Sequence, residues 1–185
     1  MKTAFLKSLI YLAIAGISMT ACKKEAPAAE DENELITTVR LKFTQGTTIQ
    51  TFEFKDIDGD GGAAPTKFDR IVLKPNTTYT LAVELLDETK TPVENKTDEV
   101  KKEQDEHLFV FSPAPASLLS YSYGDKDSKG FNVGLTGTAK TTAAGTGTLR
   151  VQLRHQPPIG GVAAKNGTAG PGSDDVNLSF NLTVQ

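Results

Sequence analysis

The chain lacks several features that define common protein classes. Among its 185 residues it has one cysteine, two histidines and no tryptophan. A single cysteine can form neither an internal disulfide nor a cluster of thiolate metal ligands. The formal charge of −3 offers no basic surface to neutralise phosphates, so we expect no nucleic-acid partner. The H-E-x-x-H, G-x-S-x-G, C-x-x-C and phosphate-binding-loop motifs are all missing, and we expect a protein that is not an enzyme.

A long hydrophobic run is also missing. The clearest apolar stretch, residues 9–17, is too short to cross a bilayer comfortably. Lys2 and Lys7 precede it, and small residues follow it up to Cys22. This order of positive, apolar and small residues is typical of a secretory signal peptide. We therefore predict that residues 1–21 are a signal peptide.

The residues at the predicted cleavage point resemble a lipobox. Met19-Thr20-Ala21-Cys22 is similar to the motif of bacterial lipoproteins, in which the cysteine thiol carries diacylglycerol and begins the mature chain. The resemblance implies that Cys22 is lipidated and anchors the protein to a lipid bilayer. The alternative is a cut after Ala21 that leaves an unmodified thiol. Residues 22–34 are polar and rich in Ala, Pro and Glu, so we expect a flexible tether.

The start of the tether implies a location. Lys24-Glu25 resembles the export signal of lipoproteins from Bacteroidota-type bacteria, although Ala26 stands where a second acidic residue is usual. The resemblance implies a lipid-anchored protein of the outer membrane. Whether it faces the periplasm or the cell surface stays open.

Residues 35–185 consist of short alternating runs separated by turn residues. Threonine is abundant, with 23 residues that mostly alternate with Val, Leu, Ile and Phe, a pattern that favours strands. We predict strands at 36–44, 48–55, 69–74, 79–86, 108–111, 118–123, 131–138, 147–155 and 176–184. The prediction is one all-β domain, an immunoglobulin-like antiparallel β-sandwich of eight or nine strands.

One stretch is more specific than the alternation. Residues 73–83, LKPNTTYTLAV, resemble the L-x-P-x-T-x-Y-x-h-x-V signature (h, apolar) of fibronectin type III and related sandwiches. The resemblance implies that the hydroxyl group of Tyr79 caps a corner between the two sheets.

The connections between strands differ in character. Residues 95–106 are polar apart from Val100 and predict a short helical insert with Thr97 or Asp98 as its N-cap. Residues 137–147 predict a flexible hairpin tip. Residues 156–173 are rich in Gly and Pro, and we expect 157–172 to be a flexible loop that provides the better recognition surface.

An acidic turn is one candidate metal site. Asp56, Asp58 and Asp60 alternate before Gly61, which matches the opening of an EF-hand calcium loop. The twelfth position is Lys67 instead of the bidentate Glu. We therefore consider a structural Ca²⁺ site and a plain Asp-Gly turn as alternatives.

The two histidines are the other candidate. His107 and His155 each lie at the edge of an apolar strand, and Glu103 and Glu106 precede His107. Two imidazoles with one or two carboxylates would suit Zn²⁺ or Cu²⁺. In the alternative interpretation each histidine ends a strand and bonds to the backbone, because the sequence does not show that residues 107 and 155 meet.

Three longer segments carry a family resemblance. Residues 56–62, 105–111 and 145–157 together make the chain similar to small Bacteroidota outer-membrane lipoproteins often labelled type 1 periplasmic binding fold proteins. These tend to be encoded beside TonB-dependent receptors. That label implies an α/β fold, whereas the alternation here predicts strands, and we follow the alternation.

The resemblance implies a function in uptake. We expect a non-enzymatic accessory that binds a ligand or metal, with a TonB-dependent outer-membrane receptor as its partner. The alternative is a structural or adhesive surface module with no small-molecule ligand.

Overall fold

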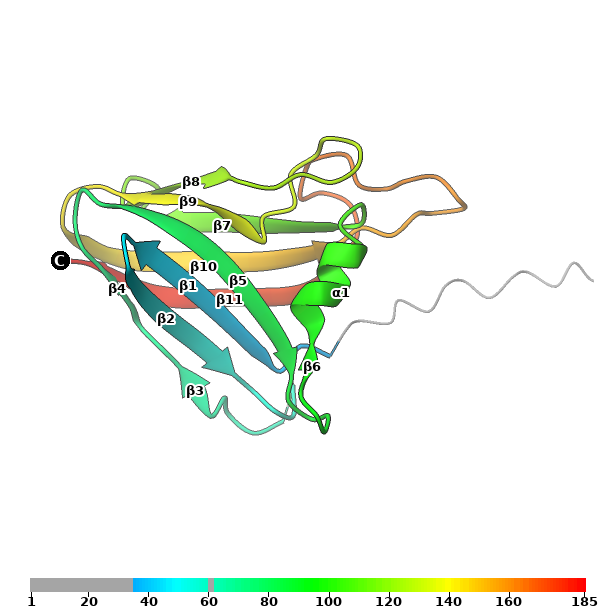
Figure 1. The fold of residues 1–185 in the computed structure, drawn as a ribbon, viewed down its shortest axis with the longest axis horizontal. Coiled ribbons are helices and arrows are strands. Elements are labelled where there is room, and N and C mark those ends of the chain that lie inside the picture. The colour runs from blue at the N-terminus through cyan, green and yellow to red at the C-terminus, as the bar shows by residue number, and fades with distance from the viewer. Residues whose placement is uncertain (1–34, 60–61) are drawn as a thin grey trace, which may run out of the picture. The chain divides into compact units, whose positions relative to one another are not determined.

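The computed structural model describes residues 35–59 and 62–185. The predicted signal peptide, Cys22, the tether and Asp60 lie outside these residues. The described chain is a β-sandwich of two sheets with one short helix, so the all-β prediction is confirmed (Figure 1). Its one helix is too short to span a membrane, and none of the described residues forms a helix that could.

The two sheets have different sizes. The first has the order β3 (Lys67–Phe68), β2 (Thr48–Lys55), β1 (Thr38–Gln45), β5 (Thr78–Asp87), β9 (Thr136–Thr141) and β8 (Leu119–Tyr123), with β6 (Glu94–Asn95) also paired to β5. The second has the order β4 (Ile71–Leu73), β11 (Ser173–Val184), β10 (Gly145–His155) and β7 (His107–Ala114). All pairs are antiparallel except β4 with β11. The described residues form eleven strands rather than eight or nine, because the two-residue strands β3 and β6 are too short to show alternation.

The core lies between the sheets and follows the alternation. In β1, Val39, Leu41 and Phe43 are at most 1% exposed, whereas Arg40 and Lys42 point outward. In β11 the buried residues are Val176, Phe180, Leu182 and Val184. Because alternate side chains of a strand point to opposite faces, one face of each strand enters the core and the other meets water.

Tyr79 fixes a point where the chain changes sheets. Its hydroxyl oxygen accepts a hydrogen bond from the backbone N–H of Lys74 at 2.9 Å, and the residue is 2% exposed. Lys74 follows β4 of the second sheet, and Tyr79 belongs to β5 of the first. The bond therefore closes the corner between the sheets and satisfies a buried hydroxyl.

The helix α1 (Lys96–Lys102) is shorter than the predicted 95–106. Its N-cap is Asn95, whose side chain accepts from the N–H of Thr97 at 3.0 Å, so neither Thr97 nor Asp98 caps it. Val100 is fully buried and packs the helix onto the core. The N–H of Leu85 in β5 donates to the Thr97 hydroxyl at 2.8 Å, which holds the helix at one end of the sandwich.

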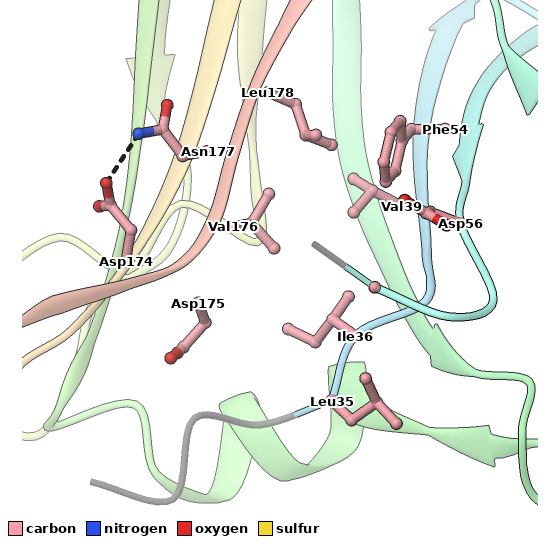
Figure 2. A pocket seen from close by; sticks show the side chains of 11 residues that line it. Leu35, Ile36, Val39, Phe54, Asp56, Asp174, Asp175, Val176, Asn177 and Leu178 are labelled. Atoms are coloured by element: carbon pink, nitrogen blue, oxygen red, sulfur yellow. Dashed lines mark hydrogen bonds between the residues drawn. The ribbon is translucent and has the colours of Figure 1, made fainter. Parts of the chain in front are cut away.

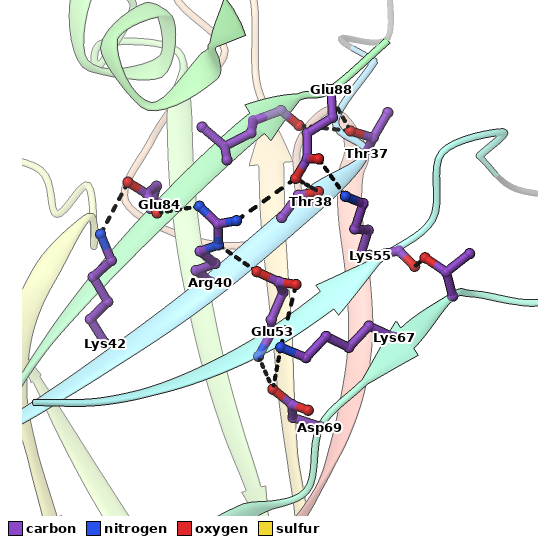
Figure 3. A network of polar contacts seen from close by, with 12 residues as sticks. Thr37, Thr38, Arg40, Lys42, Glu53, Lys55, Lys67, Asp69, Glu84 and Glu88 are labelled. Carbon is purple, nitrogen blue, oxygen red and sulfur yellow. Dashed lines mark hydrogen bonds and ion pairs between the residues drawn. The ribbon is translucent and has the colours of Figure 1, made fainter. Parts of the chain in front are cut away.

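The outward face of the first sheet carries a network of alternating charges (Figure 3). Arg40 contacts Glu53, Glu84 and Glu88, while Lys42 lies 3.0 Å from Glu84. Hydrogen bonds from Lys55 and from Thr38 hold the pKa of Glu88 below its ordinary value. Each half-exposed pair contributes about 0–1 kcal/mol, so this face is a solvated surface with its charges paired.

Two predictions about residues 131–147 are wrong. The strand predicted at 131–138 begins only at Thr136, because Val133 and Leu135 are buried from an irregular segment whose residue 133 bonds to Asp125 and Phe109. Residues 137–147 are not a hairpin tip. β9 belongs to the first sheet and β10 to the second, so residues 142–144 cross between the sheets.

Candidate metal centre

His107 and His155 lie opposite each other on neighbouring strands of the second sheet. The antiparallel register of β7 and β10 pairs residue 107 with residue 155. The ring centroids are 4.7 Å apart and the ring planes differ by 5°. Directly opposed residues project from the same face of a sheet. The fold thus brings together the two histidines whose proximity the sequence left open.

His107 is held in a defined orientation. Its side chain is fully buried, and Nδ1 lies 3.1 Å from the backbone carbonyl oxygen of Glu103. A carbonyl oxygen only accepts, so Nδ1 donates the proton in this bond. In a neutral ring with this tautomer, the lone pair is on Nε2. Metal-ligating histidines typically use the same arrangement, in which a backbone carbonyl fixes the ring through the second nitrogen.

Asp175 enters the cluster through a β-bulge. Leu153 pairs with Val176 and Arg154 pairs with Asp174, so Asp175 is the extra residue on β11. A bulge redirects a side chain that regular alternation would place on the other face. The Asp175 side chain is fully buried, and its Oδ2 lies 3.4 Å from Nε2 of His107.

The Asp175 carboxylate has an unusual environment. Neither of its oxygens accepts a hydrogen bond from any residue in the described ranges. An ionised carboxylate buried without hydrogen bonds is costly and requires a positive partner. A cation bound between Asp175 and His107 would supply such a partner.

The three side chains can converge on one ion. One ligand atom from each of His107, His155 and Asp175 lies within 4.8 Å of the other two. Tetrahedral Zn²⁺ with bonds of 2.0–2.1 Å places its ligand atoms about 3.3 Å apart. The distance of 3.4 Å between His107 and Asp175 already fits, and the wider separations must shorten on binding. Two imidazoles and a carboxylate suit Zn²⁺ or Cu²⁺ better than Ca²⁺.

The predicted acidic ligands take other positions. Glu103 contributes its backbone carbonyl, because the helix ends at Lys102 and the i, i+4 face with His107 does not form. Glu106 lies at the margin, with Oε2 3.8 Å from Nε2 of His155 and its side chain 32% exposed. Asp175 was not among the predicted ligands, because it follows the long loop and precedes the predicted strand at 176–184. The sequence signal for it is the acidic pair at residues 174–175.

A cavity of about 350 Å³ borders the cluster (Figure 2). It lies between β11 and the segment that leads into β1, with Ile36, Val39 and Val176 among its apolar walls. Its full lining is Leu35, Ile36, Val39, Phe54, Asp56, Gly59 and residues 174–178. Asp175 belongs to both the cavity wall and the cluster. Any molecule that enters the cavity therefore meets the bulge that carries Asp175.

The acidic turn is organised by hydrogen bonds. Asp58 accepts a bond from the N–H of Ala63 at 2.6 Å, and this bond, together with one to Asp56, holds the pKa of Asp58 below its ordinary value. Lys67 of β3 lies 3.3 Å from Asp69 and 3.5 Å from Glu53. The described part of the motif is thus a turn with paired groups, and calcium binding there stays a prediction.

The long connection from His155 to Ser173 is anchored at its base. Lys165 is fully buried, with Nζ 2.9 Å from Oδ2 of Asp127 and 2.7 Å from the carbonyl oxygen of Gln104. Gln156 donates to the carbonyl oxygens of Thr168 and Pro171 at 2.8 and 3.1 Å. The sequence had predicted flexibility because Gly and Pro mark turns. The buried lysine supplies the restraint that this composition does not reveal.

Comparisons with known proteins add nothing to this geometry. No family model, curated protein or solved structure matches the chain.

Proposed function

We propose that this protein is a non-enzymatic metal-binding lipoprotein of the outer membrane. In this proposal Cys22 anchors the chain to the bilayer, and His107, His155 and Asp175 bind Zn²⁺ or Cu²⁺. The observation that carries the metal assignment is the bulge at Asp175, which brings a buried carboxylate that accepts no hydrogen bond from the described residues to 3.4 Å from His107.

The ligand count favours capture over permanent storage. Three protein ligands leave a fourth position of a tetrahedral ion for an exchangeable ligand. Glu106 lies 3.8 Å from Nε2 of His155 and is partly exposed, so it can assist entry or release. An ion held in this way can be passed on, as an accessory to a TonB-dependent receptor would require.

The experiment uses the full chain, purified in detergent after processing and stripped of metal with a chelator. Thermal unfolding is followed after adding Zn²⁺, Cu²⁺ or Ca²⁺ in turn. An ion that binds only the folded state stabilises it by about 2.7 kcal/mol at a hundredfold excess over Kd. For a domain of this size that shifts Tm by roughly 5–10 °C.

The variant His155→Gln tests the assignment, since its side chain is partly exposed and its loss need not unfold the protein. Asp98→Asn, on the exposed face of α1, is the matched control and should retain the full shift. A Zn²⁺ or Cu²⁺ shift that disappears in His155→Gln alone supports the proposal. If neither ion shifts Tm, or if His155→Gln keeps the shift, the metal-binding proposal is wrong and the structural or adhesive module becomes the better account.

The alternative Ca²⁺ site is tested with a separate variant. A Ca²⁺-induced shift in Tm that disappears in Asp58→Ala would assign a structural ion to the acidic turn.

The lipid anchor is tested separately from the metal. Labelled fatty acid should be incorporated into the wild-type chain and not into Cys22→Ala.

A further inference from the structure

The connection between β10 and β11 ends in an exposed apolar turn. Ile159 and Val162 are 74% and 72% exposed, the highest values among the large apolar residues of the described chain. Gly160 and Gly161 lie between them with φ angles of +59° and +80°, the pattern of a two-residue type I′ turn. A Cβ atom at either glycine would have no atom within 4 Å. We call residues 159–162 the apolar tip.

The apolar tip is ordered rather than a loose excursion of the loop. The N–H of Ile159 donates to the carbonyl oxygen of Val162 at 2.9 Å, and the reciprocal bond measures 3.0 Å. The buried ion pair of Lys165 with Asp127 fixes the chain three residues after the turn. The polar backbone groups of both aliphatic residues are thus satisfied internally, which lowers the cost of moving them into an apolar medium.

The sequence around the apolar tip carries no charge. Residues 156–164 contain no Asp, Glu, Lys or Arg, although such residues make up 23% of the whole chain. No ionised group would have to be desolvated if the tip entered a bilayer. A surface that docks on an acidic or basic protein patch would instead be expected to present charges of the opposite sign.

The apolar tip belongs to the end of the domain that the predicted tether would join. The β10–β11 connection extends from the end of the sandwich where the chain leads into β1, whereas the β1–β2 hairpin lies at the opposite end (Figure 1). The thirteen residues 22–34, predicted from the sequence to be a tether, could span at most about 45 Å if fully extended. A lipid on Cys22 would therefore keep this end of the domain close to the bilayer surface and raise its effective concentration there.

We propose that Ile159 and Val162 insert shallowly into the bilayer that holds the lipid anchor, so that the domain docks on the membrane at two points. This inference depends on the anchor at Cys22 and is independent of the metal site. The class of ligand is a phospholipid surface, entered at the boundary between headgroups and acyl chains. Docking would orient the metal-binding end, because the same connection joins the strands that carry His155 and Asp175.

The experiment exploits the absence of tryptophan. Ile159→Trp gives the processed chain a single tryptophan at the apolar tip, and Ile49→Trp places one at the β1–β2 hairpin, where Ile49 is 62% exposed. Both full-chain variants are reconstituted by their lipid anchor into vesicles of phosphatidylethanolamine and phosphatidylglycerol with bromine-labelled acyl chains. Emission is measured in these vesicles and in vesicles without bromine.

The proposal expects the emission of Ile159→Trp to shift to shorter wavelength and to lose intensity with the brominated lipids, while that of Ile49→Trp does neither. Equal quenching of the two variants, or none for Ile159→Trp, would overturn it. A shift for Ile159→Trp that needs added outer-membrane protein would also overturn it and assign the apolar tip to a protein partner. Fatty-acid labelling of the same samples shows whether the anchor is present, and their Zn²⁺ content shows whether the metal site is intact, so each failure is distinguishable.

Discussion

The Nε2 atom of His107 and the Oδ2 atom of Asp175 lie 3.4 Å apart, although the two residues belong to non-adjacent strands of the second sheet. The strand between them, β10, contributes His155. The proposed site extends over three strands and is held by the hydrogen bonds of the sheet, so little of its backbone would have to be ordered on ion binding.

Asp175→Asn separates binding from stability. We expect this change to weaken Zn²⁺ affinity by at least the roughly 10- to 100-fold that is typical for loss of a hydrogen-bond partner behind a metal ligand, because it removes a charged ligand from the proposed site. The metal-free variant should melt no lower than the metal-free wild type, since it also removes a buried carboxylate that accepts no hydrogen bond from the described residues. Competition with a chromogenic chelator measures the first effect and thermal unfolding at pH 8 the second.

Glu106→Gln is the matched comparison, because Glu106 lies beside the same cluster but is partly exposed. It should change the affinity only slightly. An equal loss of affinity in both variants would contradict the assignment of Asp175 as a ligand.

The buried pair of Lys165 and Asp127 predicts a pH-dependent stability. Burial alone would raise the pKa of Asp127, but the bonds from Lys165 and from the backbone of Phe131 hold it below its ordinary value. A lowered pKa in the folded state stabilises the protein above the pKa of the unfolded chain, near 4, and this stability is lost as the pH falls through the folded value. Urea unfolding of the wild type should therefore show a decline below pH 4.

Asp127→Asn should remove part of that decline. At pH 7 it leaves a buried lysine without its carboxylate, and we expect a loss of about 3–5 kcal/mol. The control is Lys129→Met, because the Lys129 side chain is 43% exposed and its Nζ lies 4.0 Å from Asp105. This change should lower the free energy of unfolding by less than about 1 kcal/mol. If Asp127→Asn lowered the free energy of unfolding no more than Lys129→Met does, the pair of Lys165 and Asp127 would not anchor the β10–β11 connection.

Tyr79→Phe tests the corner between the sheets. The change keeps the packing of the ring but leaves the N–H of Lys74 without its acceptor. We expect a loss of about 1–2 kcal/mol in the free energy of unfolding, measured by denaturant titration. Tyr121→Phe removes a longer contact of 3.4 Å to Gly134 and should cost less. Similar losses would indicate that the hydroxyl of Tyr79 has no special contribution.

Gly172→Ala tests the end of the β10–β11 connection. Gly172 has a φ of +75°, and a Cβ atom there would lie 1.8 Å from the carbonyl oxygen of His155. The backbone must move, so we expect a stability loss above about 1 kcal/mol and weaker Zn²⁺ binding. Gly170→Ala, where the nearest atom would be 3.6 Å away, should leave both properties nearly unchanged. Unaltered metal binding in Gly172→Ala would show that this contact does not position His155.

Local pattern was enough to predict most of the sandwich. Alternation in β1, β2 and β11 follows directly from the two-residue period of a strand and the need to bury one face. The same reasoning failed at 131–135. Val133 and Leu135 are buried although they belong to an irregular segment, and a residue can be buried without being part of a strand.

The sequence by itself determined the all-β class and the two candidate histidines, because these depend on residue type and short-range order. The lipid anchor at Cys22 stays a prediction from the same kind of local pattern. Only the tertiary structure decided that His107 meets His155, that a bulge turns Asp175 toward them, and that Lys165 anchors a loop rich in glycine. Register between distant strands depends on packing across the whole sheet. A single extra residue in one strand then selects which side chain completes the site, and no local pattern records that choice.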